Sequence, residues 1–99
     1  MILEHAILNV KPGKAEAFEQ AMAEALPFIS ASAGFQGLEV RRCLEDPDKY
    51  VLLVKWDSVE AHETGFRGSD RYQHWRTLLH HFYDPFPTVE HYGEPVAKA

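Results

Sequence analysis

Residues 50–66 read YVLLVKWDSVEAHETGF, an apolar run followed by a helical pattern that begins at a serine and contains a histidine. The run Val51-Leu52-Leu53-Val54 is apolar at every position, which is typical of a strand buried on both faces. Ser58 can cap a helix over residues 59–66, because its side-chain oxygen accepts a hydrogen bond from a backbone N–H of the first turn. The stretch therefore predicts a central strand that leads directly into a pocket-lining helix carrying His62.

Before residue 50 the chain has two strand patterns separated by a helical one. Strands are predicted at residues 2–10, rich in Ile, Leu and Val, and at residues 36–45, where two faces alternate. Between them, four apolar residues at spacings of four, three and four share one helical face: Phe18, Met22, Ala25 and Ile29. Pro27 lacks an N–H, so we expect this helix to kink there or to restart as a second short segment.

After residue 66 the pattern predicts one more helix and a last short strand. The helix spans residues 69–82, with a core stripe at spacings of three, four and three: Tyr72, Trp75, Leu79 and Phe82. A proline-rich stretch ends it, and a strand follows at residues 88–92. We expect one domain over residues 1–93 and a loose C-terminal tail over residues 94–99.

This βαββαβ order predicts an α+β fold of the ferredoxin-like type, with a four-stranded antiparallel sheet in the strand order 4-1-3-2. Two helices can cover only one face of four strands. The other face then needs an apolar surface, and a second copy of a short chain supplies one. We therefore expect a homodimer whose two sheets face each other.

Composition narrows the classes of function. A net charge of -5 at pH 7 disfavours nucleic acid as a partner. There is no apolar run long enough to cross a membrane and no basic leader, so we expect a cytoplasmic protein that binds no membrane. Cys43 is the single cysteine, and neither Cys-x-x-Cys nor His-x-x-x-His occurs, so no metal site is expected. No glycine-rich dinucleotide fingerprint is present either, and no cofactor is expected.

Six histidines in 99 residues are the compositional oddity, because imidazole exchanges protons near neutral pH. His62 is the candidate general base, since Phe66 lies one turn later on the same helical face; a structural, hydrogen-bonded histidine is the alternative. We assign His80 to the solvent-facing side of its helix. His74 and His81 flank the apolar stripe and fit partly buried packing positions.

Aromatic residues crowd the second half of the chain. An aromatic stripe is typical of an ordinary core, yet the same side chains can line a cavity for a flat apolar ligand. Phe66, Tyr72 and Trp75 are the candidate substrate-binding residues, and Tyr72 adds a phenolic hydroxyl. Arg76 is a candidate partner for an anion if it reaches inward.

The segment from Val54 to His62, followed by Ser69-Asp70-Arg71-Tyr72, resembles the antibiotic biosynthesis monooxygenase family. The resemblance extends from Pro12-Gly13 to the strand that ends at Tyr92. It implies a dimeric α+β barrel with a cavity between sheet and helices in each subunit. Members of that family include cofactor-independent monooxygenases of quinols and aromatic polyketides, haem-degrading enzymes and isomerases of signal molecules.

For this chain the resemblance implies a cofactor-independent monooxygenase of a small aromatic molecule, with His62 as base. A non-catalytic dimer that binds a small ligand, and a purely structural or regulatory dimer, remain open alternatives. A haem-degrading relative ranks lower, because the Asn, Trp and His of that branch fall on Ala6, Gly65 and Arg76 here.

Overall fold

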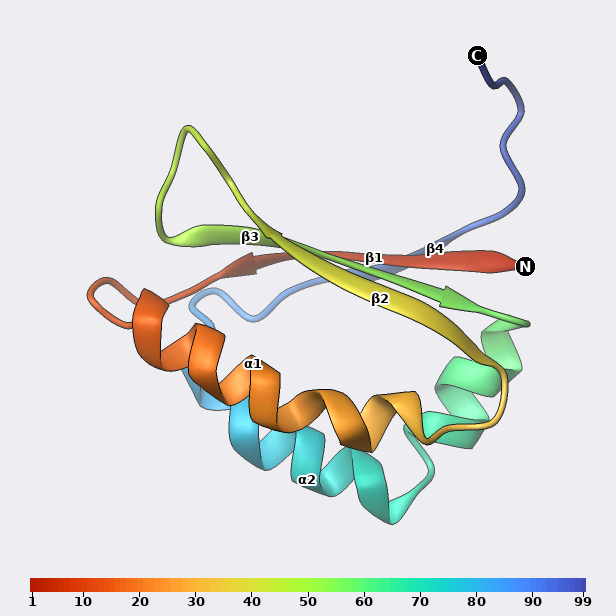
Figure 1. Cartoon of the computed structure of the whole chain (residues 1–99), viewed down its shortest axis with the longest axis horizontal. Helices are drawn as coiled ribbons and strands as arrows, with labels where there is room; N and C mark the ends of the chain where they lie inside the picture. The colour runs from red at the N-terminus through yellow and green to blue at the C-terminus, as the bar shows by residue number, and fades with distance from the viewer.

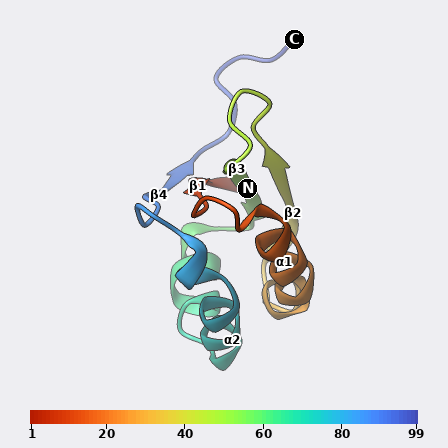
Figure 2. The same cartoon turned by 90° about the vertical axis from the view of Figure 1, so that its left-hand side faces the viewer.

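The chain folds into two layers in a computed structural model that describes all 99 residues. A four-stranded antiparallel sheet forms one layer, and the helices cover one of its faces (Figures 1 and 2). The elements in chain order are β1 (Ile2–Asn9), α1 (Ala15–Ser30), β2 (Phe35–Arg42), β3 (Lys49–Trp56), η1 (Ala61–Phe66), α2 (Asp70–Leu79), η2 (His80–Phe82) and β4 (Val89–Tyr92). The strand order β2-β3-β1-β4 confirms the ferredoxin-like sheet that the sequence predicts.

Helix α1 buries the predicted stripe, Phe18, Met22, Ala25 and Ile29. The expected restart at Pro27 does not occur, since one α-helix continues to Ser30. Pro27 lies in the last turn, where its missing N–H removes only one bond of the helical ladder. The same turn is supported by Ser30, whose hydroxyl donates to the Pro27 carbonyl at 3.4 Å.

The central strand β3 has two unlike faces. Toward the helices it buries Tyr50, Leu52, Val54 and Trp56. On the other face, Val51 and Leu53 are half-buried and Lys55 is exposed. The prediction that both faces of this strand are buried therefore holds for one face within a single chain. The second face is only half-buried, because no helix covers it. We call this second face of the sheet, where β1 adds Leu3 and Ile7, the open face.

Two segments extend beyond the open face, on the side away from the helices (Figures 1 and 2). One is the tip that joins β2 to β3. There β2 ends three residues before the predicted Glu45, and Leu44 is 95% exposed. The other is the chain after Tyr92, which has no helix or strand and whose Val96 is fully exposed. No helix of the structure has the length and apolar character needed to cross a membrane.

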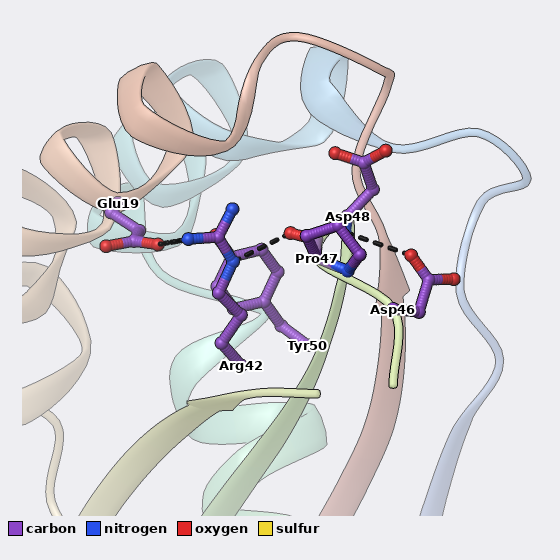
Figure 3. Close-up of polar contacts among 6 residues, drawn as sticks. All are labelled: Glu19, Arg42, Asp46, Pro47, Asp48 and Tyr50. Atoms are coloured by element: carbon purple, nitrogen blue, oxygen red, sulfur yellow. Dashed lines mark hydrogen bonds and ion pairs between the residues drawn. The ribbon is translucent and has the colours of Figure 1, made fainter. Parts of the chain in front are cut away.

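A polar cluster connects α1 to the β2–β3 hairpin at one end of the sheet. The Tyr50 hydroxyl donates to Glu19 of α1 at 2.6 Å. Arg42 lies over the Tyr50 ring, with its Nη1 3.7 Å from Glu19 and its Nε donating to the Pro47 carbonyl at 2.7 Å (Figure 3). These contacts fix the hairpin against the helix layer.

Candidate functional site

A cavity of about 60 Å³ lies between the helix-facing side of the sheet, β4 included, and the segments η1, α2 and 80–87. Its walls are mostly apolar, and its polar lining comes from Glu4, His62, Arg67 and His80. The volume is smaller than the roughly 150 Å³ of a cavity that takes benzene, so a ring would have to displace side chains at the mouth. Phe86 lines that mouth and is 61% exposed, which leaves it room to move.

A chain of three ionisable side chains runs along one wall of the cavity. Glu4 is 4% exposed, and its Oε1 accepts a hydrogen bond from Trp56 Nε1 at 2.9 Å. The same Oε1 lies 3.3 Å from Nε2 of His62, which is 3% exposed. His62 Nδ1 in turn lies 2.8 Å from Nε2 of the half-buried His91. Strand pairing explains the arrangement, because Glu4 of β1 and His91 of β4 are direct cross-strand partners.

Burial sets the protonation of this chain. It raises the pKa of Glu4 above its usual value, against the lowering effects of the Trp56 hydrogen bond and the Arg67 charge. Burial also lowers the pKa of His62 to about 3, and the positive charges of Arg67 and His91 act in the same direction. Both shifts act toward the neutral forms, and with His62 uncharged the close Glu4–His62 contact is a hydrogen bond rather than an ion pair.

The local helix type decides which residues reach the cavity from η1. Ser58 Oγ accepts the Ala61 N–H at 3.1 Å, as its predicted capping role requires. The segment then forms a π-helical turn, with the Arg67 N–H donating to the His62 carbonyl at 3.0 Å. An i→i+5 turn places Arg67 above His62, whereas in an α-helix residues five apart point about 140° away from each other.

Three of the predicted ligand-binding residues line the cavity together with His62. Phe66 and Trp75 are buried, and Tyr72 is half-buried. Phe66 contacts the other two rings edge-to-face, with centroids 5.4 Å from Tyr72 and 5.8 Å from Trp75. The fourth, Arg76, is exposed and does not line the cavity. The condition attached to Arg76, that it reaches inward, is not met in this chain, and the arginine that lines the cavity is Arg67, whose side chain is also exposed to solvent.

The assignment of His80 to the solvent-facing side was also wrong. The α-helix ends at Leu79, and His80 begins a tighter turn that directs its ring toward the cavity. There it meets Phe86 at 4.9 Å and Tyr72 at 5.9 Å between ring centroids. Burial lowers the pKa of His80, with Arg76 and Arg67 adding to the effect.

The other two histidines of this region lie outside the cavity. His74 is exposed and stacks on Phe28 of α1 at 4.8 Å, while His81 is exposed beside Phe82. The structure contains no group of three His, Cys, Asp or Glu residues that could hold a metal ion.

Sequence reasoning missed Glu4 and His91. A signal for Glu4 was present, because it shares a strand face with Ala6 and Leu8, and a carboxylate at a core position calls for a partner. His91 had no comparable signal in its own neighbourhood. Its role depends on the β1–β4 register, which pairs it with Glu4.

The chain is thus an α+β protein of the ferredoxin-like type with a buried carboxyl group and a buried imidazole beside a mostly apolar cavity. The chain belongs to the antibiotic biosynthesis monooxygenase family, whose model matches residues 1–78. It is similar to uncharacterized protein YczJ of Bacillus subtilis, 48% identical over 94 residues that cover 95% of this chain and 99% of that protein.

Solved structures agree with this assignment. A crystal structure described as a "Putative antibiotic biosynthesis monooxygenase" from Bordetella bronchiseptica is 34% identical and has a TM-score of 0.90, covering 96% of this chain and 97% of its own. A Nitrosomonas europaea protein described in the same words shares the fold at a TM-score of 0.81 with 19% identity, covering 95% and 98% of the two chains.

Proposed function

We propose that the protein is a cofactor-independent monooxygenase that acts on a small aromatic molecule, a quinol or polyketide-like ring, in the cavity between sheet and helices. The observation that carries the proposal is the Glu4–His62 pair, 3.3 Å apart, against mostly apolar walls. A proton acceptor in an apolar, water-poor site suits removal of a proton from a ring. Family membership supports this reaction class, although the fold hosts several activities.

The proposed reaction needs no electron donor other than the substrate. Loss of a proton from a phenol or an activated ring carbon leaves the electron pair on the substrate, and this anion reduces O₂. One oxygen atom enters the ring as a carbonyl and the other leaves as water, so a CH₂ group and O₂ give C=O and H₂O. The protein has to supply a base, a cavity that excludes water and a positive charge near the anion.

The lining residues divide these tasks. The base comes from the Glu4–His62 pair, in which the sequence singles out His62. Phe66, Tyr72 and Trp75 form the walls against which a flat ring would lie. Arg67 has no carboxylate partner within ion-pair distance, so its guanidinium is free to stabilise the substrate anion.

We propose in addition that the protein is a homodimer formed through the open face. Leu3, Val51 and Leu53 are half-buried there, and Ile7 and Tyr92 are 38% and 49% exposed. The β2–β3 tip and the C-terminal tail extend past this face, where both would contact a second copy (Figure 1). Light scattering tests the proposal: a dimer is expected, and Leu53→Glu on the open face should yield monomer.

Oxygen uptake tests the proposed activity. Metal-stripped protein is assayed with hydroquinones and anthrone-type phenols, beside His62→Ala, the exposed His74→Ala as matched control, and a sample without protein for autoxidation. We expect saturable uptake that His62→Ala lowers by about a hundredfold or more, while His74→Ala keeps wild-type turnover. Uptake no faster than autoxidation across the panel would contradict the proposal.

A non-catalytic binding protein is the second candidate, and one observation favours it. Both ring nitrogens of His62 already have protein partners, so His62 itself has no free nitrogen for a substrate proton. Titration with the same compounds separates the candidates. A binding module would show saturable binding without oxygen uptake and without dependence on pH.

A further inference from the structure

Both ring nitrogens of His62 have protein partners, so a different side chain of the cavity wall has to accept a substrate proton. Nε2 of His62 contacts Glu4 Oε1, and Nδ1 contacts His91 Nε2. A substrate proton cannot reach either nitrogen without displacing a protein partner. Glu4, by contrast, uses only Oε1 in its contacts with Trp56 and His62.

The second carboxyl oxygen of Glu4 has no protein partner. Oε2 accepts no hydrogen bond. It is not among the fully buried side-chain polar atoms that lack a partner, which are His5 Nδ1 and Arg71 Nε, so it keeps some exposed surface. Oε2 is therefore not sealed by protein, and the Glu4 side chain retains 5% of its surface. Because Glu4 lines the cavity, a ring held there would meet this oxygen.

We propose that Glu4 receives the substrate proton at Oε2 and that His62 and His91 pass a proton on to the surface. The inference rests on the proposed function and assigns the base within the Glu4–His62 pair. It makes Glu4 the catalytic residue of the pair, whereas His62 and His91 form the path by which the acid is reset between turnovers.

The proton transfers balance when the resting chain is neutral. Glu4 then donates its Oε1–H to His62 Nε2, and His62 donates its Nδ1–H to His91 Nε2. The bond from the substrate to its hydrogen breaks, the electron pair stays on the substrate, and Oε2 gains the proton. Oε1 releases its proton to His62 Nε2, Nδ1 of His62 releases one to His91 Nε2, and the resulting imidazolium loses its Nδ1 proton to water. When O₂ has added to the substrate anion, Oε2 returns its proton to the peroxide anion and the same transfers run in reverse from water, which restores the resting chain. The protonated peroxide then loses water to leave the carbonyl.

The groups around Glu4 hold the carboxyl in place and act on the charges that form during the transfer. Trp56 of β3 donates to Oε1 and holds the carboxyl in place. Arg67 faces the pair from the end of η1, and its charge acts on both Glu4 and His62. It disfavours any resting cation on His62 but stabilises the anion that remains on the substrate. His91 is the only one of the three relay residues with appreciable exposure.

Nitrogen NMR of the wild-type protein tests the resting state and needs no substrate. With ¹⁵N-labelled histidine, the relay requires the proton of His62 to be on Nδ1. A proton on Nε2 would mean that His62 donates to Glu4, as in a pair where the carboxylate merely orients the imidazole, and would overturn the proposal. The signal is assigned by its loss in His62→Gln.

Turnover of matched variants tests the chemistry. Glu4→Gln keeps an acceptor for Trp56 but cannot relay a proton, so we expect kcat to fall by about a hundredfold or more with ligand binding and melting temperature retained. Glu19→Gln is the matched control. Glu19 also accepts a hydrogen bond from an aromatic residue of β3, Tyr50, but it does not line the cavity, so this change should leave kcat unchanged. His91→Gln should lower kcat less, by about tenfold, and the exposed His81→Gln should leave it unchanged.

The outcomes separate this inference from the proposed function. Wild-type uptake with Glu4→Gln still active would overturn the relay and leave the monooxygenase proposal standing, with a base other than Glu4. If Glu4→Gln fails to fold, two other measurements decide. A proton on Nε2 of His62 in the wild type, or an undiminished kcat in His91→Gln, overturns the relay. Absence of uptake in the wild type defeats the monooxygenase proposal, and the NMR measurement still decides whether the relay exists.

Discussion

The two ends of β3 form the same type of contact in different surroundings. At one end Trp56 donates to Glu4 at 2.9 Å, and at the other Tyr50 donates to Glu19 at 2.6 Å. The Glu4 side chain is 5% exposed, whereas that of Glu19 is 53% exposed and has Arg42 as a counter-charge. We call these the Glu4 end and the Tyr50 end of the molecule.

Burial decides what each carboxylate contributes. At the Glu4 end it raises the pKa of the carboxyl and leaves an acid in contact with a cavity. At the Tyr50 end the phenol is the perturbed group: burial, with the Glu19 hydrogen bond and charge, raises the pKa of Tyr50 to about 12. Burial therefore leaves a carboxyl with a raised pKa beside the cavity at the Glu4 end, whereas the contact at the Tyr50 end fastens α1 to the hairpin.

The largest expected difference between the ends comes from two glycines with positive φ. A Cβ on Gly34 (φ +85°) would lie 2.7 Å from the Ala61 Cβ, close to the η1 segment that carries His62. Gly13 (φ +78°), in the turn after β1 at the Tyr50 end, has nothing within 4 Å. Gly34→Ala should cost about 2–5 kcal/mol and Gly13→Ala about 1–2 kcal/mol. Urea unfolding measures both, and equal costs would show that the Ala61 contact yields easily.

The next comparison removes the aromatic donor at each end. Trp56→Phe leaves Glu4 buried without its N–H partner and opens space in the core, so we expect a loss of about 2–4 kcal/mol in the free energy of unfolding. Tyr50→Phe keeps the ring and leaves a carboxylate that water can solvate, with an expected loss of about 1 kcal/mol. Thermal and urea unfolding check both, and a larger loss from Tyr50→Phe would reverse the comparison.

The two ends should also respond to opposite extremes of pH. The pKa of His62 is lowered from 6.5 to about 3, so between these values the unfolded chain binds a proton that the folded chain does not. Stability is then lost as pH falls through this window, by at most about 1.4 kcal/mol per pH unit. Glu4 opposes the trend, because its raised pKa contributes stability that is lost as pH rises. His62→Gln should flatten the acid side of the profile.

At the Tyr50 end the sign is reversed. The pKa of Tyr50 is raised from 10.0 to about 12, so the folded chain keeps a proton that the unfolded chain has released. Stability is present below pH 10 and is lost as pH rises toward 12. Tyr50→Phe should reduce this alkaline loss and leave the acid side unchanged. The free energy of unfolding of His62→Gln and Tyr50→Phe, measured across pH, checks the assignment. It would be refuted if His62→Gln changed the alkaline side of the profile and Tyr50→Phe the acid side.

The smallest effect is expected from Arg42→Lys. The Arg42–Glu19 pair is 3.7 Å apart with both side chains about half exposed, and such pairs contribute about 0–1 kcal/mol. Most of the change should come from the lost Nε–H bond to the Pro47 carbonyl. Unfolding at low and high salt tests this, because a dominant ion pair would make the difference depend on salt.

The fold could be predicted because the patterns that define it are local. The stripe from Phe18 to Ile29 and the apolar run of β3 fix one face of each element, and chain order then fixes the sheet. Pro27 was misjudged because the loss of one N–H bond did not end a helix whose buried stripe continues past it from Ala25 to Ile29. The homodimer stays a prediction based on the open face.

The site was predictable only in part, because side-chain direction depends on helix type and strand register. Phe66 and Trp75 line the cavity as their spacing indicated. Arg76 was expected to reach inward and His80 to face solvent, but His80 lines the cavity and Arg76 does not. For His80 the reason is that the α-helix ends at Leu79 and the next turn is tighter. The Glu4–His91 pairing joins residues 87 positions apart through β1–β4 register, which no local pattern contains.

The π-helical turn of η1 has a consequence for comparing chain lengths. A turn closed from residue 67 back to residue 62 contains one residue more than an α-helical turn. Deleting Gly65 would let the segment close as an ordinary α-helical turn, with the arginine N–H still donating to the histidine carbonyl, now four residues away. A homologue one residue shorter between the capping serine and α2 would therefore keep its arginine above the histidine, although the two positions are five apart in this chain.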